Sequence, residues 1–283
     1  MIKIVKNKKL FFIALITLLV SIVIITKIYI NTTDNKDNNI ELPSYVDSII
    51  INDDFFNSMS EKEVINYKIL NSIDFFKNVT GKYTYTDKIS KYNEVVKYCA
   101  DIENKKSYVS IISDDGNTNE EIIYKDNIQR QFDNIKNLYT DFQGTEYVVN
   151  ENIRKLKPKD RYNKKNGEFI DRRDGDFLVQ DNITLFNQEI QSYLKNYDNW
   201  EIEGDIDYLN RKSILINGKL GFTGKSGENK FKIIVDKETG IILNLDFLDK
   251  DNNTLMSMET NEINIDKNID PSIFEKSTDA YKN

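Results

Sequence analysis

The chain has 283 residues, with 39% hydrophobic and 30% charged side chains, a composition typical of a globular protein and not of a disordered or fibrous one. It contains no histidine and one cysteine, which excludes histidine-based metal sites, a serine–histidine–aspartate triad and an internal disulfide. The first 30 residues hold five lysines and no acid, which leaves 34 basic against 46 acidic side chains, a charge of −12, on the remainder. An acidic exterior argues against nucleic acid as a partner.

The N-terminal residues predict a membrane anchor. Residues 1–9 form a short stub with four lysines, and residues 10–30 are apolar apart from Lys27. A helix rises about 1.5 Å per residue, so this run spans roughly 31 Å, which matches the core of a bilayer. The preceding lysines place the N-terminus in the cytoplasm and the main domain outside, as a single-pass protein of the cell membrane. A cleaved signal peptide is the competing interpretation, but no A-x-A-like cleavage site follows the run.

The next segments predict a tether and a helix. Residues 31–57 are rich in Asn and Asp, which indicates a flexible tether. Ser60 and Glu63 then match a capping box, and apolar side chains recur at helical spacing as far as Phe76. This pattern predicts an amphipathic helix of about four turns, with Gly81 just beyond its end.

Short segments rich in Tyr, Val and Ile follow, and turn residues separate them, as expected of antiparallel strands. These segments are 81–92, 94–102, 106–116, 120–127 and 129–142. A charged stretch over 150–182 comes next, in which Lys155–Arg161 and residues 173–176 are expected to be solvated loops. A second amphipathic helix is predicted over Thr184–Tyr197, after which strands resume at Trp200.

The last part of the chain predicts three strands and a bulge. Apolar residues alternate over 231–235 and 243–247, and Gly240 supplies the positive φ that the intervening turn needs. The alternation shifts by one residue within 256–265, which indicates a β-bulge near Asn261. Asp270 is expected to cap a final turn in which Pro271 is the first residue.

No catalytic or metal-binding pattern stands out in the sequence. Residues 249–254 begin like a calcium loop, but Thr254 and Thr260 stand where such a loop needs Gly and Glu, so a polar hairpin turn is favoured. Cys99 lies in a strand-like run and is expected to be buried. We therefore expect no catalytic residue, no metal and no cofactor; an enzyme would need a clustered pair of carboxylates in a cleft.

The order of elements predicts an α+β domain, in which helices lie on one face of a curved antiparallel sheet. This domain is expected over 58–276, with a tail at 277–283. The aromatic residues are expected mainly in its core, and the functional alternative is that some line a hydrophobic groove. The candidates for such a groove are Tyr83, Tyr85, Tyr108, Tyr124, Phe132, Tyr193, Trp200, Phe231 and Phe247.

Several segments resemble the LolA/LppX/RseB group of extracytoplasmic proteins. The resemblance covers about residues 61–275 and is carried by WEIEG (200–204), LNRKSILING (209–218), KIIVDKETGIILNLDFLDKDNN (232–253) and IDPSIF (269–274). Its motif residues are Trp200, Arg211, Asp236, Gly240 and Pro271. It implies an unclosed β half-barrel with helices on its concave face. That face holds acyl chains in the lipoprotein carriers and contributes to envelope stress sensing in the RseB type.

The chain also resembles the clostridial germination lipoprotein GerS and its relatives, which implies support of a cell-wall amidase during spore cortex modification. A lipoprotein would carry a lipobox cysteine, whereas this chain carries the predicted anchor instead. Two functions therefore stay open. The first is a non-enzymatic accessory protein that binds another envelope protein, such as an enzyme of sporulation or germination. The alternative is a carrier or sensor that binds a lipid or a lipoprotein.

Overall fold

The computed structural model describes residues 51–144, 151–161, 190, 193–224 and 226–283. The chain divides into two compact units, Met1–Pro43 and Ser44–Asn283, and the first unit lies outside the described residues. Across the ranges that the structure describes, no helix is both long and apolar enough to span a membrane. The predicted anchor at 10–30 and most of the predicted tether lie outside these ranges, so the anchor stays a prediction.

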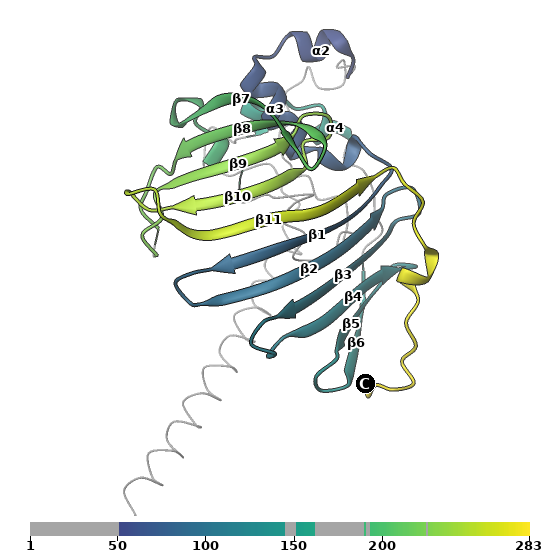
Figure 1. The fold of residues 1–283 in the computed structure, drawn as a ribbon. Helices are drawn as coiled ribbons and strands as arrows, with labels where there is room; N and C mark the ends of the chain where they lie inside the picture. The colour runs from purple at the N-terminus through teal and green to yellow at the C-terminus, as the bar shows by residue number, and fades with distance from the viewer. Residues whose placement is uncertain (1–50, 145–150, 162–189, 191–192, 225) are drawn as a thin grey trace, which may run out of the picture. The chain divides into compact units, whose positions relative to one another are not determined.

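The second unit is built on one antiparallel sheet of 11 strands, in the order β6-β5-β4-β3-β2-β1-β11-β10-β9-β8-β7 (Figure 1). β6 and β7 end this order without pairing to each other, so the sheet is unclosed, which confirms the predicted antiparallel architecture. The strands are β1 (Asn78–Asp87), β2 (Tyr92–Asp101), β3 (Lys106–Ser113), β4 (Asn119–Lys125), β5 (Ile128–Asp133), β6 (Leu138–Gln143), β7 (Trp200–Tyr208), β8 (Arg211–Lys219), β9 (Lys230–Asp236), β10 (Ile242–Leu248) and β11 (Thr254–Ile265).

The sheet curves strongly at its β7 end. Tyr208, the last residue of β7, donates a hydrogen bond to the carbonyl oxygen of Thr260 in β11 at 3.2 Å. Three strands separate β7 from β11 in the sheet order. Neighbouring strands lie about 4.8 Å apart, so a flat sheet could not bring these residues into contact.

The described helices are short. They are α2 (Asp53–Asn57), α3 (Glu61–Leu70), α4 (Glu151–Arg154) and the 3-10 turns η2 (Ser72–Asp74), η3 (Pro158–Arg161), η4 (Tyr197–Asn199) and η5 (Pro271–Phe274). α3 begins at the predicted capping box, in which Glu63 N donates to Ser60 Oγ and Ser60 N donates to Glu63 Oε2. The helix ends earlier than predicted because Asn71 leaves helical geometry and its side-chain amide donates to the Tyr67 carbonyl at 2.9 Å.

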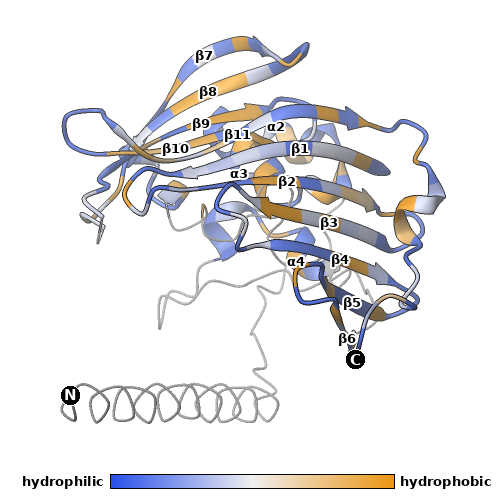
Figure 2. Cartoon of the chain, turned by 60° about the horizontal axis from the view of Figure 1, so that its bottom comes forward, coloured by the Kyte–Doolittle hydropathy of each residue, from blue (hydrophilic) through white to orange (hydrophobic). Residues whose placement is uncertain are grey.

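Hydrophobic and hydrophilic residues are mixed along the strands (Figure 2), and the buried hydrophobic ones form two separate clusters on the sheet. The inner face, defined here as the one that packs on α3 and η2, includes Val96 and Tyr98 of β2. The outer face carries a separate cluster that includes Cys99, which alternates with them. From the helical side, the inner core receives Ile65, Ile69, Ile73 and Phe76. The helix is therefore held mainly by apolar burial against the sheet.

The C-terminal residues cover part of the outer face. Phe274 of η5 packs in the cluster of Cys99 and Phe132, and the Tyr281 ring lies 4.9 Å from the Phe132 ring. Lys282 pairs with Leu138 of β6 in parallel. Residues 277–283, expected as a tail, thus extend the edge of the sheet. η5 also lies opposite to α3, although helices were expected on one face only. Asp270 caps it as predicted, accepting from Ser272 N at 3.0 Å.

The pairing of β1 with β11 contains the predicted bulge. Tyr83 lies opposite Thr260 and Lys82 opposite Glu262, so Asn261 is the extra residue. Its side-chain oxygen accepts a hydrogen bond from Thr84 Oγ1 at 2.9 Å. Gly81, expected just beyond the helix, lies inside β1 instead. A Cβ there would lie 2.3 Å from the Tyr98 ring, so the glycine makes room for that ring.

Three further expectations differ from the structure or fall outside it. Lys155–Arg161 is not a solvated loop, because Arg161 is fully buried and donates to Asn71 Oδ1 at 2.6 Å. Phe55, expected in the tether, is buried in α2 with its ring 5.3 Å from Tyr67. In the second predicted helix, residues 190, 193 and 194 are helical and Tyr197 belongs to η4, while the rest of 184–192 and residues 173–176 lie outside the described residues.

Candidate apolar binding site

Four aromatic rings meet near the junction of β8, β9 and β10. The Tyr193 ring lies 5.5 Å from Phe247, 6.1 Å from Phe231 and 6.4 Å from Phe222, measured between ring centroids. Phe231 and Phe247 lie opposite each other in the ladder of β9 and β10. Sequence alternation therefore places these two rings together, and the helical residue Tyr193 packs against both.

The β8–β9 hairpin, residues 220–229, brings Phe222 to this cluster. Leu220 N donates to Asn229 O at 2.8 Å and Gly224 N to Glu228 O at 2.7 Å, which continues the ladder beyond β8 and β9. Gly218, in β8, has no side chain to meet the Phe231 ring, where a Cβ would lie 2.1 Å away. The glycines of this segment thus allow the rings and the hairpin to approach closely.

An open hollow of about 380 Å³ lies beside the rings. It is lined by Lys219, Leu220, Gly221, Phe222, Thr223, Asn229 and Lys230. Ligand sites in proteins commonly span about 300–1,000 Å³, so this hollow fits one apolar group or part of a longer chain. Leu220 is 7% exposed and forms a covered floor, whereas Phe222 is 56% exposed at its wall.

Two polar features sit at the same hollow. Asn229 Oδ1 is buried and has no hydrogen-bond partner among the residues that the structure describes. Lys219 lies directly opposite Lys230 in the ladder, an arrangement in which like charges repel. Lys230 Nζ donates to Lys250 O at 2.9 Å and to Asn252 Oδ1 at 2.8 Å, which directs it toward the next hairpin. The site therefore combines an apolar floor with a basic margin.

The structure brings together Tyr193, Phe231 and Phe247 of the nine groove candidates. Tyr83, Tyr124 and Trp200 are buried within the inner core, and Tyr85 packs against it; Tyr108 and Phe132 belong to the outer-face cluster. The outer-face residues thus lie apart from the aromatic site. Whether any candidate contacts a ligand stays a prediction.

Trp200 supports α3 from the end of the sheet. Its Nε1 donates to the Leu194 carbonyl at 3.1 Å, and Lys62 Nζ lies 5.0 Å from its ring. The same ammonium donates to the carbonyl oxygens of Trp200 and Tyr197. One lysine of α3 therefore links the helix to η4 and to the start of β7.

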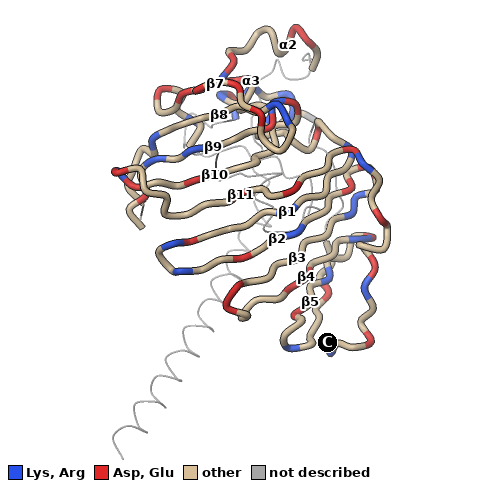
Figure 3. Tube along the Cα trace, in the orientation of Figure 1, with Lys and Arg blue, Asp and Glu red and all other residues tan. Residues whose placement is uncertain are grey.

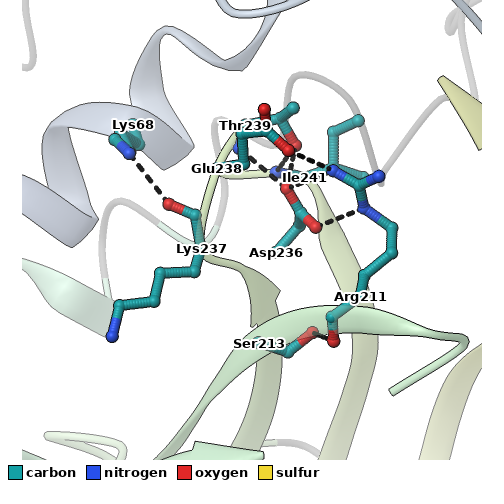
Figure 4. Close-up of polar contacts among 8 residues, drawn as sticks. All are labelled: Lys68, Arg211, Ser213, Asp236, Lys237, Glu238, Thr239 and Ile241. Carbon is teal, nitrogen blue, oxygen red and sulfur yellow. Dashed lines mark hydrogen bonds and ion pairs between the residues drawn. The ribbon is translucent and has the colours of Figure 1, made fainter. Parts of the chain in front are cut away.

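Two motif residues of the family resemblance, Arg211 and Asp236, meet beside the β9–β10 turn (Figure 4). Arg211 donates through Nε and Nη2 to both carboxylate oxygens of Asp236, with Nη2 at 3.1 Å from Oδ1. Asp236 Oδ1 also accepts from the backbone and hydroxyl of Thr239, each at 2.7 Å. The bonds to Asp236 raise the pKa of Arg211. Gly240 follows in the same turn, while the motif residue Pro271 lies on the outer face.

The same turn holds the C-terminal half of α3. Lys68 Nζ donates to Lys237 O at 2.8 Å, and burial lowers the pKa of Lys68. Hydrogen bonds thus join β8, the β9–β10 turn and α3 through Arg211, Asp236 and Lys68 (Figure 4). This arrangement stabilises the fold and offers no reactive group.

Reactive chemistry is sparse in the described residues. No group of three carboxylate or thiol side chains gathers there as a metal site. Burial raises the pKa of Cys99 to about 12, so its thiol stays protonated at neutral pH. Asp249 accepts from Asp251 N and Asn253 N, each at 2.8 Å, which makes the calcium-like segment a hydrogen-bonded turn.

Phe222, Leu220 and Asn229 are not among the nine groove candidates predicted from the sequence. Phe222 lies in a glycine-rich hairpin and follows neither the strand nor the helix pattern of apolar residues. It becomes part of a site only because its ring lies near Tyr193 in the folded chain. The signal that could have found it is composition, since KLGFTGKSGENK places one aromatic residue among three glycines and three lysines. An aromatic residue in such a turn has no core to fill.

No family model matches this chain, and no curated protein matches it. Solved structures similar to it include an uncharacterized conserved protein from Thermus thermophilus, with 8% identity over 79% of this chain and 98% of that chain and a TM-score of 0.43. The MucA/MucB complex of Pseudomonas aeruginosa matches with 8% identity over 77% of this chain and a TM-score of 0.42, and this chain spans 62% of that one.

LprF from Mycobacterium bovis matches with 10% identity over 74% of this chain and 95% of that chain, at a TM-score of 0.39. A LolA superfamily protein and a putative outer membrane lipoprotein-sorting protein domain are also among the similar structures. The LolA/RseB group named from the sequence is therefore represented among these structures. The GerS-related branch stays a prediction.

Proposed function

We propose that this chain is a non-enzymatic binding protein of the cell envelope, whose aromatic site takes an apolar ligand with an acyl chain. The observation that carries this proposal is the meeting of Tyr193, Phe222, Phe231 and Phe247 beside an open hollow. A soluble domain gains stability by burying its rings, so an exposed Phe222 beside a hollow favours a ligand over simple core packing.

The margin of the site suggests the polar end of that ligand. Lys219 lies opposite Lys230 in the ladder, and an anionic group of the ligand could pair with Lys219 while Lys230 Nζ keeps its bonds to Lys250 O and Asn252 Oδ1. Asn229 Oδ1 could accept from a hydroxyl or amide of the ligand, since it has no other partner within the described ranges. An anionic or hydroxylated amphiphile thus fits the site as a carrier's or sensor's ligand. The proposed location is outside the cytoplasm, tethered to the cell membrane by residues 10–30.

The test is native mass spectrometry of the full chain, gently extracted from its own membrane. We expect an added mass of lipid size that organic solvent removes. Tyr193→Ala should lose this mass, whereas Tyr139→Ala, which changes a ring of the outer-face cluster, should keep it. Displacement of a fluorescent fatty acid gives a second readout on the same variants. A bare chain that also fails to bind the fluorescent fatty acid would contradict the proposal.

A second candidate function is the accessory role, in which the chain supports another envelope protein such as a cortex-remodelling enzyme in a GerS-like manner. The observation that favours it is one exposed apolar side chain on each face of the β5–β6 ladder. Ile128 is 37% and Phe142 48% exposed, and each lies opposite a glutamine in the same ladder. Photo-crosslinking from position 142 in intact cells should then capture one defined partner, and loss of the chain should change cell-wall or cortex composition. An unchanged wall would exclude this role.

A further inference from the structure

Five hairpin turns share one end of the sheet, which we call the tip rim. In an antiparallel sheet every second hairpin turns at the same end. The pairing registers place the turns 88–91, 114–118, 134–137, 220–229 and 249–253 at this end (Figure 1). The turns 102–105, 126–127, 209–210 and 237–241 lie at the opposite end, where the last of them contacts Lys68 of α3.

Three turns of the tip rim each expose one large apolar side chain. Ile89 is 49% exposed, Ile135 49% and Phe222 56%. They are separated in sequence and belong to three different hairpins, so no single local pattern accounts for them. Ile112 and Leu138, 46% and 40% exposed, lie within two residues of turns at this rim. Five of the seven exposed large hydrophobic side chains of the described residues therefore gather at one end of the sheet.

Aspartates give two of these turns the same construction. Asp87 Oδ1 accepts from Ile89 N at 2.8 Å and from Ser90 N at 3.2 Å. Asp133 Oδ1 accepts from Ile135 N at 3.1 Å and from Lys136 N at 2.9 Å. In each turn the aspartate carboxylate binds the backbone amides two and three residues later, which closes the turn. The isoleucine two residues after the aspartate then lies at the tip. The Ser90 hydroxyl and the Lys136 ammonium also donate to these carboxylates, and together with the backbone bonds they lower the pKa of both aspartates.

Lysines flank every apolar tip of the rim. The three hairpins carry Lys88, Lys91, Lys136, Lys219 and Lys230, against the acids Asp87, Asp133 and Glu228. All three acids accept backbone amides within their own turns, including Ser226 N to Glu228 Oε2 at 3.0 Å. At the β5–β6 tip Lys136 is ion-paired with Asp133 at 2.6 Å and leaves no net charge, so only the β1–β2 and β8–β9 tips are positive in contrast to the −12 of the chain beyond residue 30. Figure 3 shows basic residues at the β1–β2 tip and acidic ones at the β3–β4 turn. The two rim turns without a large apolar side chain, 114–118 and 249–253, hold Asp114, Asp115, Asp249 and Asp251 against Lys250.

We propose that the three apolar-tipped hairpins of the tip rim, at Ile89, Ile135 and Phe222, dock on the surface of an anionic lipid bilayer. A single apolar side chain between lysines is suited to an interface, where the ring or aliphatic group enters the acyl boundary and the ammonium groups contact phosphates. Separate tips on different hairpins suit a fluid surface, whereas a protein–protein interface packs a buried apolar core inside a polar rim. The docking needs no occupant in the aromatic site, so it goes beyond the proposed function.

The test uses the full chain reconstituted in vesicles that contain brominated lipids, which quench a tryptophan at the bilayer. Ile89→Trp and Ile135→Trp place reporters on the tip rim, and Ile128→Trp is the matched control at the opposite end. Trp200 is 1% exposed and gives the same background in all three proteins. We expect stronger quenching at positions 89 and 135 than at 128 in vesicles with phosphatidylglycerol. The difference should shrink in phosphatidylcholine alone or in high salt.

Charge removal adds an independent arm. Lys88→Gln combined with Lys91→Gln should weaken the quenching of the tryptophan at position 135. About tenfold more anionic lipid should be needed for the same quenching, because each lysine contributes separately to binding near an anionic surface. In the unmodified chain, hydrogen exchange of turns 88–91 and 134–137 should slow in anionic vesicles and not in zwitterionic ones. Equal quenching at all three positions, or quenching that ignores lipid charge, would overturn the proposal. Fatty-acid displacement by the same variants should be unchanged, which separates this proposal from the aromatic site.

Discussion

Gly240 lies against the backbone of α3 at Lys68. A Cβ built on Gly240 would be 2.3 Å from both the carbonyl carbon and the carbonyl oxygen of Lys68. Gly240 also has a φ of +78°, in the left-handed region. The β9–β10 turn and the helix can therefore meet only where the chain has no side chain, and this contact sets how closely α3 approaches the sheet.

Gly240→Ala should destabilise the fold by about 3 kcal/mol, because the left-handed backbone and the clash with Lys68 act together. Gly116 has a φ of +72° and an open environment, so Gly116→Ala should cost only about 1 kcal/mol. Urea unfolding of the two variants measures the difference. Equal losses of unfolding free energy in the two variants would show that α3 shifts to make room for a side chain at position 240.

The bond between Arg211 and Asp236 should also be essential for stability. Asp236 is 1% exposed, and Asp236→Ala would leave Arg211 Nε and the Thr239 amide without their acceptor, while Arg211 Nη2 keeps Glu238 at 3.1 Å. We expect a loss of about 3 kcal/mol in unfolding free energy. Asp207, 67% exposed and 2.8 Å from Lys212, is the control pair, and Asp207→Ala should cost less than about 1 kcal/mol. Chemical denaturation of both variants at neutral pH tests this contrast.

Stability should fall at alkaline pH through Tyr197. Burial raises the pKa of Tyr197 to about 12, whereas an unfolded tyrosine ionises near about pH 10. The unfolded chain then loses its proton first, so this stabilisation is present below about pH 10 and is lost as the pH rises toward about 12. The stability difference between the wild-type chain and Tyr197→Phe should therefore narrow from about pH 8 to about pH 11.5. Urea midpoints across this range give the measurement, and a constant difference would argue that Tyr197 titrates normally.

Cys99 should report on the C-terminal segment of the outer face. Its thiol is fully buried beside Phe274, and its pKa of about 12 keeps it protonated. Phe274→Ala removes part of this cover and should raise the rate of thiol labelling in native conditions by about tenfold or more, through local opening. Phe222→Ala, in the β8–β9 hairpin, should leave the rate unchanged. Fast labelling of the unmodified chain would show that the segment does not protect Cys99.

Local patterns in the sequence determined much of the secondary structure. The capping box of Ser60 and Glu63, the positive φ of Gly240, the cap of Asp270 and the bulge at Asn261 are all found where the residues predict them. Each depends on neighbours a few residues apart or on the two-residue period of a strand, so the chain encodes it without help from distant segments.

Only the tertiary structure decided which residues meet. Tyr193 reaches Phe231 and Phe247, Tyr208 reaches Thr260, and the C-terminal residues cover Cys99 through contacts between distant segments. The two-residue alternation of a strand looks the same whichever face of the sheet its aromatic residues occupy. The sequence therefore could not tell which aromatic residues belong to the aromatic site and which belong to the outer-face cluster. The curvature of the sheet and the packing of α3 made that choice, because burial depends on what lies opposite in space and not on what lies next in the chain.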